Sequence, residues 1–145
     1  MKYAILNEFW KWAGITPQRY AADKPQLEEY MFPEWSRLIA LAVEFIDSRD
    51  CSDAALDFVL TVMALDNETE DILDHVADNA DDSYTEALIR KGVHHPMYGA
   101  RWQTAELISR RSPADSRVLL SMLLSDSDEY VVRRANCAID VLGLK

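Results

Sequence analysis

The chain has 145 residues, of which 49% are hydrophobic and 28% are charged, and its formal net charge is −10. This length and composition predict one globular domain that buries a core without metals or disulfides, and they exclude wholesale disorder. A surplus of negative charge disfavours nucleic acid and anionic membranes as partners and favours a basic protein.

The sequence shows no targeting or membrane-spanning pattern, and we expect a cytoplasmic protein. Apolar character is lost within a few residues of Met1, and the longest apolar run, 38–43, is far shorter than the roughly 20 residues that span a bilayer. Cys51 and Cys137 have no metal-ligand or redox spacing and are expected to be small buried residues in a reducing compartment.

Residues 1–49 predict an irregular helical cap. A first helix over 3–13 ends at a glycine, and Thr16-Pro17 reads as a cap followed by proline at the first helical position. Pro25 and Pro33 are expected to open further short helices, the last continuing to about residue 46.

Aromatic residues concentrate in this cap, where nine of the 14 lie within residues 1–45. They favour a hydrophobic end cap, which the terminal unit of a stacked helical array requires. A partner-binding aromatic patch is the alternative, since tryptophan and tyrosine are common in binding hot spots.

From residue 50 the chain predicts about three pairs of short helices with a recurring offset. Asp50-Cys51-Ser52, Asp82-Ser83-Tyr84 and Asp115-Ser116-Arg117 begin the leading helices, 32 and 33 residues apart. Asp or Ser at these starts can accept hydrogen bonds from first-turn N–H groups. The expected helices are 52–63, 68–77, 83–91, 97–109, 115–124 and 128–142.

The last pair combines two kinds of helix. Residues 118–124 leave little polar face, so we expect that helix to be covered on more than one side. In the following helix, Val131, Ala135, Ala138, Ile139 and Leu142 form a single apolar stripe. Such pairs bury their apolar faces only by stacking, which predicts an all-α solenoid of two-helix units.

The segment 128–139, Asp-Glu-Tyr-Val-Val-Arg-Arg-Ala-Asn-Cys-Ala-Ile, resembles the second helix of a HEAT-type repeat. Ala100-Arg101 is a fainter copy, and Glu70-Asp71-Ile72-Leu73 one that lacks the arginine. The resemblance covers residues 50–143 and implies a short HEAT-like α-solenoid. HEAT-like arrays mostly bind other macromolecules, so it also implies a binding protein.

Enzyme chemistry finds little support in the residues. His94 and His95 are the one histidine cluster, but zinc requires further convergent ligands, so a solvated turn is the preferred interpretation. No serine or cysteine lies in a nucleophile motif, and the four glycines form no phosphate-binding loop. We expect no catalytic residue, no metal and no cofactor.

The arginines of residues 87–145 raise the possibility of nucleic-acid binding, but phosphate recognition requires a dominant positive field. Arg101 and Arg133 also have a structural interpretation, in which turn aspartates of neighbouring units pair with them. The candidate aspartates are Asp66, Asp126 and Asp128.

The negative charge is concentrated in one block, 44–86, which holds 14 of the 25 acidic residues and one basic residue, Arg49. Asp50, Asp53, Asp66 and Asp82 lie at expected helix starts, where carboxylates are favourable. Capping does not explain the acidic residues on the expected helix 68–77 and in the turn after it, which are Glu70, Asp71, Asp74, Asp78 and Asp81. Since no base within the block offsets their repulsion, we expect a partner to supply the positive charge.

The sequence therefore predicts a non-catalytic protein-binding module. In size and charge the chain also resembles acidic bacterial toxin-immunity proteins, which implies an inhibitor of a basic partner such as a nuclease toxin. A general HEAT-type adaptor is the first alternative, and a small metalloenzyme using His94 and His95 the second. The expected partner-binding residues are Glu70, Asp71, Asp74, Asp78, Asp81, Asp82 and Trp102.

Overall fold

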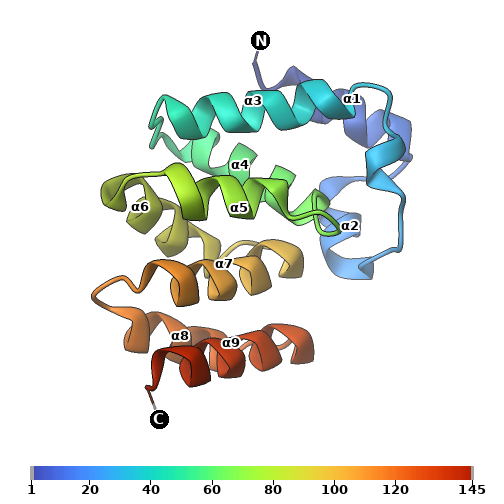
Figure 1. The fold of residues 1–145 in the computed structure, drawn as a ribbon. Helices are drawn as coiled ribbons and strands as arrows, with labels where there is room; N and C mark the ends of the chain where they lie inside the picture. Colours follow the sequence, from blue (N-terminus) through green and yellow to red (C-terminus); the bar gives the residue numbers. More distant parts are fainter. Residues whose placement is uncertain (1, 145) are drawn as a thin grey trace.

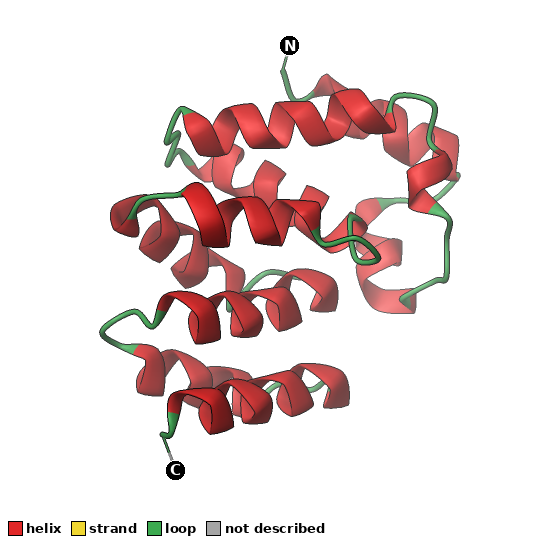
Figure 2. Cartoon of the chain, viewed as in Figure 1, coloured by secondary structure: helices red, strands yellow, loops and turns green. Residues whose placement is uncertain are grey.

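The computed structural model describes residues 2–144, which fold into nine α-helices and one 3₁₀ helix, η1, without a strand (Figures 1 and 2). None of these helices is both long and apolar enough to cross a membrane. The elements are α1 (Ala4–Ala13), α2 (Pro17–Asp23), η1 (Glu29–Met31), α3 (Trp35–Asp47), α4 (Asp53–Leu65), α5 (Asp71–Asn79), α6 (Asp82–Gly92), α7 (Tyr98–Arg111), α8 (Ser116–Leu124) and α9 (Glu129–Leu142).

The all-α prediction is confirmed, and the expected helices are present with boundaries shifted by one to three residues. One expected element is absent, because Pro25 opens no helix. Lys24 closes α2 in the left-handed conformation (φ 49°), and the chain then runs without helical structure to η1. Pro33 lies two residues before the first residue of α3, so a helix does follow it as expected.

The helices form a layered stack. Helices α3, α5, α7 and α9 lie side by side in that order, while α4, α6 and α8 lie behind them (Figure 1). Helix α1 lies behind α3, and the segment from α2 to η1 lies at the right-hand end of the stack, beside the end of α5 (Figure 1).

Helix α4 lies at the centre of the core and contacts α3, α5, α6 and α7. Ser52 begins it by accepting a hydrogen bond from the Ala55 N–H, and ten of its 13 residues are buried. Aromatic residues of the preceding segment pack on its N-terminal half, where Phe45 and Phe58 make an edge contact at 5.3 Å. The aromatic cap is mostly internal, although Trp12 and Tyr30 are 42% and 49% exposed.

The leading helices do not keep the regular offset that the sequence indicated. Their N-cap residues are Ser52, Asp81 and Asp115, which are 29 and 34 residues apart. Asp82 is therefore the first residue of α6 and is not equivalent to Asp50. The mismatch arises because the connections between helices differ in length. Residue identity alone does not reveal these lengths.

Two expectations about burial are wrong. Cys51 and Cys137 are free and exposed: Cys51 lies in the turn before α4, and Cys137 faces outward from the last helix. Helix α8 is covered on one side only, leaving Val118 58% and Met122 45% exposed. Cys137, Val118 and Met122 are exposed because no further helix of the described residues packs on the outer side of α8 and α9, whereas Cys51 is exposed because it lies in a surface turn.

Close approach between α6 and α7 depends on Gly92. A Cβ atom at this position would lie 2.2 Å from the Thr104 Oγ1 atom, which donates a hydrogen bond to the Ala100 carbonyl. We predict that Gly92→Ala lowers the free energy of unfolding by about 1–3 kcal/mol, the usual cost of overpacking. Urea denaturation measures it.

The matched control is the double variant Gly92→Ala/Thr104→Ala, which removes the clashing hydroxyl. The loss of stability caused by Gly92→Ala should be smaller when it is measured in the Thr104→Ala background than when it is measured in wild type. Equal losses in both backgrounds would contradict a steric origin of the effect.

Candidate partner-binding surface

Helix α5 begins where buried Asp66 holds its first turn. The carboxylate of Asp66 accepts hydrogen bonds from the Ile72 N–H at 3.1 Å and from the Thr69 hydroxyl at 2.8 Å. This bond to the first turn satisfies an N–H group that has no partner within the helix. Glu70 precedes the helix in the left-handed conformation (φ 56°) and makes no side-chain cap.

Asp71, Asp74 and Asp78, here called the α5 face, lie on the same side of this helix, as their spacing predicts. The opposite side is buried through Ile72, Leu73 and Val76. Asp71 and Asp78 are exposed, whereas Asp74 is partly buried. The sequence therefore identified the side of α5 that faces away from the core.

Arginines of α7 offset part of the acidic block. Asp74 pairs with Arg110 at 2.7 Å, and Asp82, whose side chain is 94% exposed, pairs with Arg111 at 2.8 Å. Arg49 is the one basic residue within the block, whereas Arg110 and Arg111 come from a later layer of the stack. Charge counted along the sequence does not reveal pairing across layers.

Asp81 is the N-cap of α6, although the sequence indicated a helix start two residues later, at Ser83. Its carboxylate accepts a hydrogen bond from the Tyr84 N–H at 2.8 Å and pairs with Arg49 at 3.0 Å. Capping and an ion pair thus account for Asp81 without any partner.

Of the six expected acidic residues, Glu70, Asp71 and Asp78 pair with no cation within the described residues 2–144. Asp74, Asp81 and Asp82 serve internal contacts as well as facing solvent. Among these six residues, the unpaired ones are therefore Glu70, which directly precedes α5, and Asp71 and Asp78 on the exposed side of that helix.

Further polar contacts connect the front helices α3, α5, α7 and α9. Asp47 of α3 contacts His75 of α5 at 2.7 Å, and Glu106 of α7 pairs with Arg134 of α9 at 3.0 Å. Each of these pairs joins two adjacent helices of the stack.

Trp102 does not lie with the acidic residues. It is 6% exposed, its ring packs edge-on against Tyr130 at 5.4 Å, and the Arg134 guanidinium lies 4.8 Å from its centroid. These contacts hold α7 against α9. Trp102 therefore has little surface to offer as an apolar anchor for a partner.

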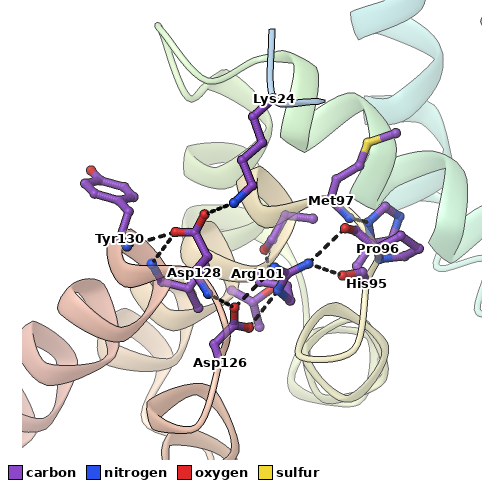
Figure 3. Close-up of polar contacts among 11 residues, drawn as sticks. Lys24, His95, Pro96, Met97, Arg101, Asp126, Asp128 and Tyr130 are labelled. Atoms are coloured by element: carbon purple, nitrogen blue, oxygen red, sulfur yellow. Dashed lines mark hydrogen bonds and ion pairs between the residues drawn. The ribbon is translucent and has the colours of Figure 1, made fainter. Parts of the chain in front are cut away.

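A polar network joins the turns at one end of α7 and α9 (Figure 3). Arg101 pairs with Asp126 through two contacts of 2.7 and 3.2 Å, and donates to the carbonyl groups of His95 and Pro96 at 2.8 and 2.9 Å. The pairing of Arg101 with a turn aspartate is confirmed. Arg133 instead lies over the Tyr130 ring at 5.9 Å.

Asp128 extends this network to the N-terminal segment. It caps α9 by accepting from the Tyr130 and Val131 N–H groups, and Lys24 pairs with it (Figure 3). Burial opposes ionisation of Asp128, yet the hydrogen bonds from Lys24 and the two N–H groups together lower the pKa of this carboxyl. The contact fixes the loop after α2 to the last layer.

His94 and His95 do not converge on a common site. His94 is exposed, while His95 is buried and contacts Asp57 at 3.1 Å through Nε2 and accepts from the Met97 N–H through Nδ1. Within residues 2–144, no three His, Cys, Asp or Glu side chains gather in a way that could hold a metal ion.

We predict that Asp126→Asn lowers the free energy of unfolding by about 3 kcal/mol, because it leaves the largely buried Arg101 guanidinium without its counter-charge. Urea denaturation at neutral pH measures the change. Asp74→Asn is the matched control at an exposed pair and should cost at most about 1 kcal/mol. Equal losses of unfolding free energy in the two variants would show that burial does not determine how much the Arg101–Asp126 pair contributes to stability.

Buried Glu29 accepts a hydrogen bond from the Tyr20 hydroxyl at 2.6 Å. Burial raises the pKa of Glu29, and the nearby Glu68 carboxylate raises it further, against the opposing effect of the Tyr20 bond. A folded-state pKa above the unfolded value means that the folded state binds the proton more tightly. The contribution to stability is therefore greatest below the ordinary pKa and is lost as the pH rises through the folded pKa.

Glu29→Gln removes this titration and keeps an acceptor for Tyr20. We predict that the variant gains stability relative to wild type as the pH rises from about 4 to 7, where wild type must bury a charge. Urea denaturation at several pH values tests it, with exposed Glu28→Gln as control. A stability difference independent of pH would contradict the prediction.

No protein-family model matches this sequence, and neither a curated protein nor a solved structure matches it. The function must therefore be argued from the site itself.

Proposed function

We propose that this protein is a non-catalytic binding module that receives a basic protein partner on the exposed side of α5. The observation that carries the proposal is the contrast among its acidic residues. Asp74, Asp81 and Asp82 each pair with an arginine from another part of the fold, whereas Asp71 and Asp78 are exposed on one helix side and pair with no cation within residues 2–144.

Unpaired like charges on one helix side repel each other and contribute nothing to folding. A basic partner relieves that repulsion and is attracted over a distance set by the salt concentration, about 8 Å in physiological salt. Such complementarity mainly speeds association and selects the partner. The net charge of −10 acts in the same direction.

In its specific form, the proposal is an immunity-type inhibitor that covers the substrate site of a basic partner, such as a nuclease toxin, with carboxylates. The layered packing of α3 to α9 supports the further proposal of a short HEAT-like array, although the unequal spacing of its helix starts departs from a regular repeat. A general adaptor of this class is the alternative, and it differs in having no toxin partner. No observation favours the metalloenzyme.

The test uses the charge-reversed double variant Asp71→Lys/Asp78→Lys as bait beside wild type, in affinity capture from the native host with quantitative mass spectrometry. These positions are chosen because Asp74 holds Arg110, so its replacement also disturbs the fold. We expect wild type to enrich a basic protein at least tenfold over the variant. Binding of the purified partner should slow as salt rises.

The control is Glu8→Lys/Glu86→Lys, which makes the same change in net charge at exposed positions of α1 and α6. It should capture the partner as wild type does. Equal capture by all three baits would contradict the proposal, and loss in both variants would mean that net charge rather than the α5 side selects the partner.

A further inference from the structure

A small cavity of about 290 Å³ lies at the N-terminal end of α5 and shares Asp71 with the α5 face. Two aromatic side chains from different elements line it, Tyr30 of η1 and Trp35 at the start of α3, together with buried Leu65 of α4. We call this cavity the aromatic slot. Its volume lies at the lower limit of ligand pockets, roughly 300 Å³, so it suits one side chain rather than a cofactor.

Two buried carboxylates in the slot are held in place by internal donors. Glu29, 5% exposed, accepts from Tyr20, and Asp66, 3% exposed, accepts from Thr69 and from the first turn of α5. Each carboxylate has further acceptor sites beyond these bonds. The slot therefore has a fixed acidic lining that does not depend on a ligand.

Two more carboxylates, Glu68 and Asp71, line the slot from exposed positions. Neither pairs with a cation, and no basic side chain lines the slot among residues 2–144. The other cavities that carry carboxylates, such as the one beside Lys24, also contain a base. An apolar aromatic wall with four carboxylates and no base is complementary to a single cationic side chain.

The carboxylates that line the slot also repel each other. Burial raises the pKa of both Glu29 and Asp66, and the charges of Glu68 and Asp71 raise them further. The exposed Tyr30 hydroxyl has a raised pKa because Glu28 and Glu68 lie nearby. Both the buried and the exposed carboxylates therefore contribute to a negative electrostatic potential inside the slot.

We infer that the aromatic slot receives an arginine side chain of the basic partner, with the guanidinium against Tyr30 and Trp35 and its N–H groups donating to Glu68 and Asp71. Arginine suits this lining better than lysine, because its planar, weakly hydrated cation stacks on aromatic faces and donates to two carboxylates at once. The inference rests on the proposed function. It identifies the type of partner side chain, an arginine, that binds next to the α5 face.

The experiment titrates the full chain with N-acetylargininamide and follows the indole N–H resonance of Trp35 by NMR, assigned through Trp35→Phe. We expect a saturable shift at Trp35. N-acetylcitrullinamide, which has the same shape without the charge, should leave the resonance unmoved. N-acetyllysinamide should bind more weakly than the arginine probe.

Two exposed slot residues supply the variants. Glu68→Gln should weaken binding of N-acetylargininamide about tenfold, the value of one charge-assisted hydrogen bond, and Tyr30→Ala about two- to fivefold. Glu86→Gln, an exposed carboxylate on α6, is the matched control and should bind as wild type does. The absence of a Trp35 shift, an equal response to citrulline, or unchanged binding by Glu68→Gln would each overturn the inference.

The two proposals fail in different ways. If the slot does not bind arginine while Asp71→Lys/Asp78→Lys still abolishes partner capture, the slot assignment is wrong and the acidic surface stands. If Trp35 responds to arginine but no basic protein is captured, the slot assignment stands and the proposed function is wrong.

Discussion

The ion pair between Arg101 and Asp126 is the contact on which the order of the last layers depends. Its two short contacts join the start of α7 to the turn before α9, and the same guanidinium holds the carbonyl groups of His95 and Pro96 (Figure 3). A buried charge is costly unless it is paired and hydrogen-bonded, so this arrangement tolerates few alternatives. Asp128 and Lys24 extend it to the N-terminal segment.

The same constraint explains the uneven charge of the chain. Acidic residues dominate the middle layers and arginines the later ones, and the stack brings Asp74 to Arg110 and Asp82 to Arg111. A charge asymmetry along the sequence thus becomes attraction between successive layers. Glu68 in the aromatic slot and Asp71 and Asp78 on α5 take part in no such pair within residues 2–144, and these three residues support the proposed function.

Local signals in the sequence predicted the helices well because each depends on neighbouring residues. Ser52 and Pro17 mark helix starts through their own geometry, and the apolar spacing of α5 gave its exposed side. The surroundings of the candidate residues were predicted only in part. Asp81 was misread because capping depends on where α6 begins, and Trp102 because its burial depends on α9, a helix almost 30 residues away.

The sequence by itself determined the all-α class, the positions of most helices and the excess of negative charge, since these follow from composition, capping chemistry and apolar periodicity. Only the tertiary structure decided which carboxylates are paired, because ion pairs join residues such as Asp74 and Arg110 that lie 36 positions apart. It also decided the aromatic slot, whose walls come from η1, α3, α4 and α5. No single segment carries that pattern, so packing alone brings its aromatic and acidic residues together.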